Sequence, residues 1–242
     1  MNKLIFNNKI QVVALIPAAG IGSRMQTNCP KQYLKIAGKT IIEHTISVLL
    51  KQPRISQIIV LLNKNDILFY QLDIAKNSII KTVIGGNQRA DSVLTGLNYL
   101  SDNLQSEFCW VLVHDAVRPC LNQSDLASII CFIDHQQSSC GGILATPVRD
   151  TIKCSIKGKI EISHSLERSE LWHALTPQFF PLTLIKNCLI QALSQKAIIT
   201  DEASALEYCG YHPKLLKGKI DNLKITQPED LVLAEFYLSR TL

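Results

Sequence analysis

The sequence predicts an α/β fold with a doubly wound, mostly parallel sheet, because strand patterns alternate with helix patterns along the chain. The strand patterns are short and almost wholly apolar, which is typical of parallel strands covered by helices on both faces of a sheet. Five such strands are predicted, at Val12–Ile16, Ile58–Leu62, Lys81–Ile84, Trp110–Val113 and Gly142–Thr146.

Three amphipathic helices are predicted between these strands. The first begins after Thr40, because Thr40 and Glu43 form a capping box, in which a hydroxyl and a carboxylate satisfy the unpaired amides of a helix start. Apolar residues at helical spacing predict the other two helices, over Asp91–Leu100 and Ser124–Ile133.

A fourth helix is predicted close to the C-terminus, over Glu229–Arg240. Thr226 and Glu229 form a second capping box at its start, with Pro228 in the first turn, where the missing amide costs nothing. The chain ends soon after this helix, so we expect a single domain over residues 1–242 and no second enzyme downstream.

One segment interrupts the alternation of strands and helices. Within residues 151–165, Lys153–Ile156 and Lys159–Ile162 are predicted as strands joined by the two-residue turn Lys157-Gly158, in which the glycine supplies a positive φ. A two-stranded ribbon is marginal alone in water, so it needs a further surface to lie against. We therefore expect a protruding β-hairpin arm over residues 151–165, and a neighbouring subunit is a candidate for its partner.

Composition argues against several classes of protein. The net charge of +5 is mild and no basic run is interleaved with aromatic residues, so nucleic-acid binding is not indicated. No uninterrupted run of about 18 apolar residues predicts a membrane span. The eight cysteines include no C-x-x-C pair, and the N-terminus lacks a convincing export signal, so we expect a reduced, cytoplasmic protein.

The strongest local signal follows the first predicted strand, where residues 17–25 read PAAGIGSRM and Lys31 comes soon after. A strand that runs into small residues lets a nucleotide approach the backbone amides. The dinucleotide-binding fingerprint is excluded because Met25 stands where it needs a glycine, and a P-loop is excluded because Tyr33 stands where its first glycine would fall. What remains is a glycine turn that delivers Arg24 and Lys31 beside a bound nucleotide.

Eight strings of the chain resemble those of the 2-C-methyl-D-erythritol 4-phosphate cytidylyltransferase family. They are LIPAAGIGSRM, PKQYL, GGNQRADSV, VLVHDAVRP, PVRDT, LWHALTPQFF, TDEASALEY and DNLKIT, and the similarity runs from about Val12 to the C-terminus. The resemblance implies a Rossmann-like fold of the nucleotide-diphospho-sugar transferase type. It also implies transfer of CMP from CTP to methylerythritol phosphate in the non-mevalonate isoprenoid pathway, Mg²⁺ carried with CTP, and a homodimer.

The resemblance assigns the chemistry to four cations. Arg24 and Lys31 would neutralise charge on the α-phosphoryl group and the leaving pyrophosphate, while Arg168 and Lys224 would hold the phosphate of the acceptor. Because the hairpin of this family reaches into the partner subunit, Arg168 would complete the partner's site, with Thr151 and Thr176 as further substrate-binding residues. A phosphomonoester with a second pKa of about 6 is already ionised at neutral pH, so the nucleophile needs no general base.

Nucleotide binding is assigned in the same way, mostly to backbone groups and small side chains. Asp115 would meet the ribose or the magnesium ion, Arg118 would support Asp115, and Asp221 is a weaker candidate for the metal. The full set assigned to the nucleotide by this resemblance is Ala18, Ala19, Gly20, Gly22, Gly86, Asn87, Ser92, Asp115 and Arg118.

Two other functions fit parts of the sequence. Another nucleotidylyltransferase of the same architecture, acting on a sugar phosphate, would share Gly20–Arg24 but would not need Arg168 and Lys224 around a terminal phosphate. A nucleotide-binding regulatory protein that has lost turnover would bind CTP without releasing pyrophosphate. The presence of all four cations argues against this second alternative.

Overall fold

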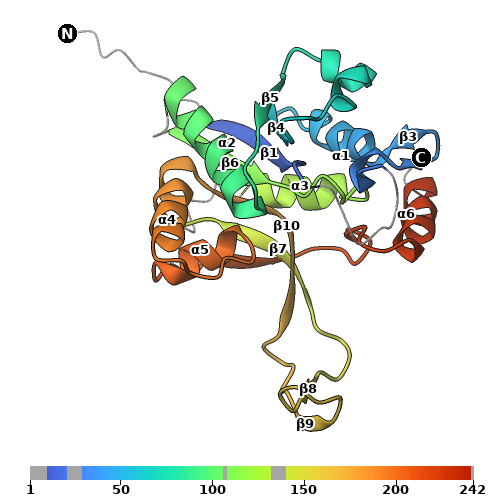
Figure 1. Cartoon of the computed structure of the whole chain (residues 1–242), viewed down its shortest axis with the longest axis vertical. Coiled ribbons are helices and arrows are strands. Elements are labelled where there is room, and N and C mark those ends of the chain that lie inside the picture. The colour runs from blue at the N-terminus through green and yellow to red at the C-terminus, as the bar shows by residue number, and fades with distance from the viewer. Residues whose placement is uncertain (1–9, 21–28, 106–107, 132–139, 241–242) are drawn as a thin grey trace.

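The computed structural model describes residues 10–20, 29–105, 108–131 and 140–240. Its centre is a seven-stranded sheet in the order β11-β7-β10-β6-β1-β4-β5 (Figure 1). Strands β6, β1, β4 and β5 are parallel neighbours, whereas β10 runs antiparallel between β6 and β7. The strands of this sheet are β1 (Gln11–Pro17), β4 (Ile55–Leu62), β5 (Ile80–Ile84), β6 (Cys109–Val113), β7 (Gly142–Pro147), β10 (Trp172–Pro181) and β11 (Lys214–Lys217).

The predicted α/β fold with a mostly parallel sheet is confirmed, and each of the five predicted strands is present. Two strands of this sheet, β10 and β11, were missed, as was the separate two-stranded ribbon of β2 (Lys35–Ile36) and β3 (Lys39–Thr40). Strand β10 carries Pro177 and a register shift between Ala174 and Gln178, so its side chains do not alternate in a regular way. Strand β11 is short, lies at the sheet edge and has lysines at both ends, so it lacks the apolar pattern of a buried strand.

Helices cover both faces of the sheet (Figure 1). Side chains of β1 alternate between two apolar clusters: Val12, Ala14 and Ile16 pack with α1 and α3, whereas Val13 and Leu15 pack with α2, α4 and α5. This alternation follows from the two-residue period of a strand. The helices are α1 (Ile41–Leu50), α2 (Arg89–Asn103), α3 (Gln123–Ile130), α4 (Leu182–Ser194), α5 (Glu202–Tyr208) and α6 (Glu229–Ser239).

The predicted capping box at Thr40 is confirmed. The amide of Glu43 donates to Thr40 Oγ1 over 3.3 Å, and the Thr40 amide donates to Glu43 Oε2 over 2.8 Å. Helix α3 ends at Ile130, before the predicted Ile133, and residues 132–139 lie outside the described residues. Helix α6 ends at Ser239, one residue before the predicted end.

The predicted capping box at the start of α6 is wrong by one residue. The carboxylate that satisfies the free amides belongs to Asp230, which accepts from the amides of Thr226 and Gln227 over 2.7 Å and 2.9 Å. With Pro228 as the residue before the helix, Asp230 is the second helical residue, so its side chain reaches back over the turn.

The hairpin arm projects away from the body of the molecule (Figure 1). Its strands are β8 (Lys153–Ser155) and β9 (Ile162–Ser165), so the second strand begins three residues later than predicted. Gly158 does adopt a positive φ of 79°, in a turn closed by the Lys159 amide on the carbonyl of Ile156. Residues 159–161 extend the loop because the strands meet only from Ser155 paired with Ile162.

Candidate active site

A cavity of about 320 Å³ opens where β1, β5 and β6 end. Carboxyl ends of parallel strands are where ligands of α/β proteins bind, because the loops and helix starts that follow them converge there. The cavity brings together nine residues that the sequence analysis assigned to the site. They are Ala18, Ala19, Gly20, Lys31, Gly86, Asn87, Ser92, Asp115 and Lys224. The remaining lining residues are Pro17, Gln32, Gln88, Arg89, Ala116 and Val117.

The loop after β5 forms one wall of the cavity, and Ser92 fixes its shape. The Gly86 amide donates to Ser92 Oγ over 3.0 Å, and the hydroxyl donates to the Gln88 carbonyl over 3.0 Å. A Cβ at Gly85 would lie 2.8 Å from Ser92 Oγ, and one at Gly86 would overlap the Cβ of Asp91. The two glycines are therefore required by close packing, which leaves backbone groups facing a ligand.

The carboxylate of Asp115 is surrounded by three cationic side chains, those of Arg89, Arg118 and Lys224. Its Oδ1 accepts from Nε of Arg89 over 3.1 Å, and its Oδ2 lies 3.3 Å from Nε of Arg118 and 3.0 Å from Nζ of Lys224. Burial raises the pKa of Asp115, but the charges of Arg89, Lys224 and Arg118 outweigh burial and hold this pKa well below its usual range. Asp115 is therefore ionised, and both of its oxygens are paired with cations.

A buried network behind Asp115 fixes its backbone. The Asp115 amide donates to Thr176 Oγ1 over 3.1 Å, and Thr176 Oγ1 lies 2.9 Å from Nδ1 of His114. Because Nε2 of His114 lies 3.2 Å from the carbonyl of Arg118, Nε2 carries the proton and Nδ1 accepts from Thr176. Burial lowers the pKa of His114 to about 4, so this histidine is neutral and has a structural role.

Thr176, for which the resemblance implies substrate binding, belongs to this network and is not among the residues that line the described cavity. Its side chain is buried, its hydroxyl proton is used by His114, and its carbonyl accepts from the side chain of Asn222 over 2.7 Å. Arg118 is also buried and donates to the Asn222 carbonyl over 2.7 Å. Both residues hold Asp115 in place from behind the cavity.

Arg89 and Glu202 are residues that the sequence reasoning did not single out. Arg89 is the first residue of α2 and lines the cavity, and its Nη1 and Nη2 donate to the two carboxylate oxygens of Glu202 over 2.6 Å and 3.0 Å. Burial raises the pKa of Glu202, and the charge of Arg89 opposes that rise. Arg89 lies in the string GGNQRADSV and Glu202 in the string TDEASALEY, both of which carry the family resemblance. Nothing in the sequence, however, indicates that two residues so far apart in the chain form an ion pair.

Lys31 reaches the cavity from a short 3₁₀ helix, η2 (Lys31–Tyr33). Its Nζ donates to the Ile225 carbonyl over 3.1 Å, which places it beside the segment that carries Lys224. The next residue, Gln32, donates to the carbonyl of Ala18 over 2.9 Å and so ties η2 to the end of β1. The other predicted residues of this region, Gly22 and Arg24, lie outside the described residues.

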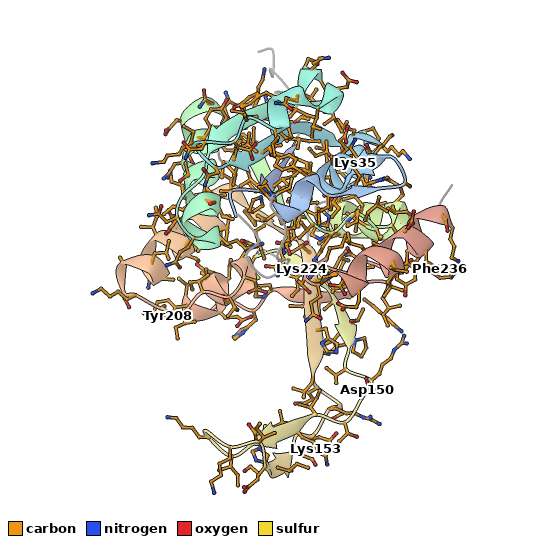
Figure 2. All side chains as sticks on the ribbon, turned by 45° about the vertical axis from the view of Figure 1, so that its right-hand side comes forward. Lys35, Asp150, Lys153, Tyr208, Lys224 and Phe236 are labelled. Atoms are coloured by element: carbon orange, nitrogen blue, oxygen red, sulfur yellow. The ribbon has the colours of Figure 1, made fainter. Side chains whose placement is uncertain are left out.

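The two predicted residues at the start and just after the end of the arm, Thr151 and Arg168, are not among the described residues that line this cavity. Thr151 and Arg168 are exposed, and Nη1 of Arg168 donates to the carbonyl of Arg149 at the base of the arm. Figure 2 shows Asp150 and Lys153 out on the arm, away from Lys224 in the body of the molecule. Arg168 is thus bound to the backbone of Arg149, and it is not among the described residues that line the cavity with Lys224.

The described residues do not fit a metal site made by the protein alone. No group of three or more His, Cys, Asp or Glu side chains among them could hold a metal ion. Among the described residues that line the cavity, Asp115 is the one acidic side chain, and it is already paired with three cations. Asp221 lies outside the lining and has a buried carboxylate oxygen with no hydrogen-bond partner among the described residues.

Comparison with known proteins settles the family. The sequence profile of the 2-C-methyl-D-erythritol 4-phosphate cytidylyltransferase family matches residues 12–240. The chain belongs to this family. A protein of Photorhabdus laumondii named 2-C-methyl-D-erythritol 4-phosphate cytidylyltransferase is 58% identical over 243 residues, which are 99% of this chain and 100% of the relative.

Solved structures agree with this assignment. A crystal structure titled 4-diphosphocytidyl-2C-methyl-D-erythritol synthase is 36% identical with a TM-score of 0.80, and the match covers 95% of this chain and 99% of that one. The 2-C-methyl-D-erythritol 4-phosphate cytidylyltransferase of Francisella tularensis is 32% identical with a TM-score of 0.79, covering 94% of this chain and 99% of that one. The likeness therefore extends over nearly the whole length of the chain.

Proposed function

We propose that the chain transfers a cytidylyl group from CTP to 2-C-methyl-D-erythritol 4-phosphate and releases pyrophosphate. The observation that carries this proposal is the cavity of a family member lined by Lys31, Lys224, Arg89 and backbone groups of the β5 loop. Such a lining offers positive charge for phosphates and amides for a base. The described part of the chain contains no helix that is both long and apolar enough to cross a membrane.

The reaction needs positioning and charge neutralisation more than proton transfer. An oxygen of the acceptor phosphate attacks the α-phosphorus of CTP in line, the bond from that phosphorus to the bridging oxygen breaks, and pyrophosphate leaves. Since the acceptor phosphate is ionised at neutral pH, no base is required, which agrees with the neutral, buried His114. Lys31, with Arg24, would stabilise the charge that develops on the α-phosphoryl group and on pyrophosphate.

Magnesium would enter with CTP as part of the substrate. Asp115 is the side chain of the described cavity that could contact such an ion, and it would have to give up part of its pairing with Lys224 to do so. That exchange would free the ammonium group of Lys224 for the acceptor phosphate. The side chain of Lys224 is 37% exposed, so it can turn toward a ligand.

The second acceptor cation, Arg168, would come from a partner subunit, with Thr151 beside it. Supporting this homodimer, the arm carries an unusual number of exposed aliphatic side chains for a ribbon that pairs only with itself. These side chains are Ile156, Ile160, Ile162 and Leu166. An arm that lies on a second copy would cover them and would bring Arg168 to the partner's cavity.

A cytoplasmic location fits both the substrate and the cysteines. CTP is an intracellular nucleotide, and all eight cysteines of the chain are free thiols in the structure. We therefore place the enzyme in the cytoplasm, acting on small molecules rather than on nucleic acid.

The test is a panel of nucleotides and acceptors with product identification by mass spectrometry. The proposal predicts 4-diphosphocytidyl-2-C-methyl-D-erythritol from CTP and methylerythritol phosphate, with UTP and dTTP turned over far more slowly. Turnover of sugar 1-phosphates with another nucleotide would move the enzyme to the alternative nucleotidylyltransferase. Tight CTP binding with no product from any acceptor would indicate a regulatory protein.

A further inference from the structure

Two of the proposed catalytic cations meet at one short segment of the chain, Lys224 to Thr226. Lys224 extends its own side chain to Asp115, whereas the carbonyl of the next residue, Ile225, accepts from Nζ of Lys31 over 3.1 Å. Because Lys31 is bound to a backbone atom, its position depends on where this segment lies. Whatever fixes the segment therefore contributes to fixing the ammonium group of Lys31.

The segment is held on one side by packing and by one strand-like hydrogen bond. The Ile225 amide donates to the carbonyl of Val117 over 2.9 Å, and the Ile225 side chain is fully buried against Ile36, Ile41 and Ala234. These contacts fix the depth of Ile225. They do not fix the direction of its carbonyl, which depends on the backbone that follows.

Asp230 fixes that following backbone. Its Oδ2 accepts three hydrogen bonds, from the Thr226 amide over 2.7 Å, from Thr226 Oγ1 over 3.0 Å and from the Gln227 amide over 2.9 Å. The carbonyl of Ile225 belongs to the same peptide group as the Thr226 amide. A bond that aims this amide at Asp230 consequently aims the Ile225 carbonyl the opposite way, toward Lys31, because the peptide group is planar.

The carboxylate also acts on Lys31 through its charge. Burial raises the pKa of Asp230, but the hydrogen bonds from Thr226 and Gln227 and the charge of Lys31 outweigh burial and lower it below its ordinary value. Asp230 is thus ionised at neutral pH and close enough to the ammonium group of Lys31 to feel its charge. Asp230 therefore acts on Lys31 in two ways, through the peptide group that it orients and through its own charge.

We propose that Asp230 is a positioning residue for catalysis, which holds the Thr226 peptide so that the Ile225 carbonyl presents Lys31 to the α-phosphate of CTP. This inference rests on the proposed function, and in particular on the catalytic role of Lys31. Asp230 does not line the cavity, and the resemblance gave it no role.

The experiment is a double-mutant cycle between Asp230→Asn and Lys31→Ala, measured as kcat and KM for CTP with methylerythritol phosphate. Asparagine keeps the shape, but its neutral amide oxygen accepts the three hydrogen bonds that converge on Oδ2 more weakly than a carboxylate does, and the charge near Lys31 is lost, so the Thr226 peptide is held less firmly. A catalytic group misplaced by about 1 Å costs about 10²-fold in rate, so D230N should lower kcat about 10- to 100-fold. In the K31A background, the same change should cost less than about 3-fold, because the residue through which Asp230 acts is gone.

Glu229→Gln is the matched control, since Glu229 is the neighbouring acid of the same helix and is exposed. It should leave kcat within about 2-fold of wild type. If D230N does not fold, Thr226→Val removes only the hydroxyl bond to Asp230 and should lower kcat in the same direction, again only while Lys31 is present. Melting curves of every variant separate loss of fold from loss of rate.

Failure of the inference about Asp230 can be distinguished from failure of the proposed function. Wild-type turnover and its loss in K31A test the proposed function before Asp230 is considered. An active wild type with D230N equal to E229Q, or with the D230N loss fully retained in the K31A background, would overturn the inference while leaving the function intact.

Discussion

The ion pair between Arg89 and Glu202 should be a main support of the cavity, and Glu202→Gln tests it. Glutamine has nearly the same shape, but it keeps only one oxygen to accept from the guanidinium group, and its NH₂ group points a donor at the other nitrogen. One of the two bonds, which measure 2.6 Å and 3.0 Å, is therefore lost. Bonds to charged groups contribute about 1.5–3 kcal/mol each.

The size of the effect is reduced because water can reach part of Arg89, whose side chain is 29% exposed. We therefore expect E202Q to lower the free energy of unfolding by about 2 kcal/mol, and the melting temperature of a chain of this length by about 4–8 °C. Since Arg89 directly follows the loop of Gly86 to Gln88, CTP should also bind less tightly, by about 3- to 10-fold.

Urea unfolding at several temperatures and CTP titration by calorimetry measure the two effects. Glu207→Gln is the control, because Glu207 is exposed on the same helix, and it should change stability by less than about 0.5 kcal/mol. An E202Q protein as stable as wild type, or a loss equal to that of E207Q, would refute the account of this pair.

The β5 loop, Asp115 and Arg168 can each be tested by single substitutions. Gly86→Ala should abolish CTP binding while leaving most of the stability, because its Cβ would overlap Asp91 and push the loop aside; calorimetry checks this. Asp115 has a lowered folded-state pKa, so its stabilisation is complete above its unfolded pKa of about 3.9 and is lost as pH falls through the lower folded value. Urea unfolding between about pH 5 and pH 2 should show a larger acid-dependent loss of stability in wild type than in Asp115→Asn, in which only the other carboxylates titrate. A 1:1 mixture of Arg168→Ala and Lys31→Ala subunits should recover about a quarter of wild-type turnover if Arg168 acts on the partner's site, since half of the dimers would carry one intact site; no recovery would place Arg168 elsewhere.

The strands and the glycine loops could be predicted from sequence because each is dictated by neighbouring residues. Thr40 and Glu43 lie three apart, and the apolar period of β1 is readable within a few residues. Strand β10 could not be found in this way, because its pairing with β6 and β7 supplies the order that its own irregular pattern lacks.

The charge cluster of the site was only partly predictable. Asp115, Lys31 and Lys224 were placed by resemblance, and the cavity brings all three together. The pairing of Arg89 with Glu202 depends on how α2 and α5 pack on one face of the sheet, and no local pattern encodes it. The capping carboxylate of α6 was misassigned because the sequence offers adjacent acids, and only the geometry of the turn chooses between them.

Charge neutralisation at Lys31 is decided by pyrophosphate release from CTP and Mg²⁺, measured with and without methylerythritol phosphate for wild type and Lys31→Ala. Loss of one electrostatic donor to the transition state costs about 10²–10³ in rate. We expect release that requires the acceptor and that falls by about that factor in K31A. Release that ignores the acceptor, or that is unchanged in K31A, would contradict the claim that this cavity transfers the cytidylyl group by charge neutralisation at Lys31.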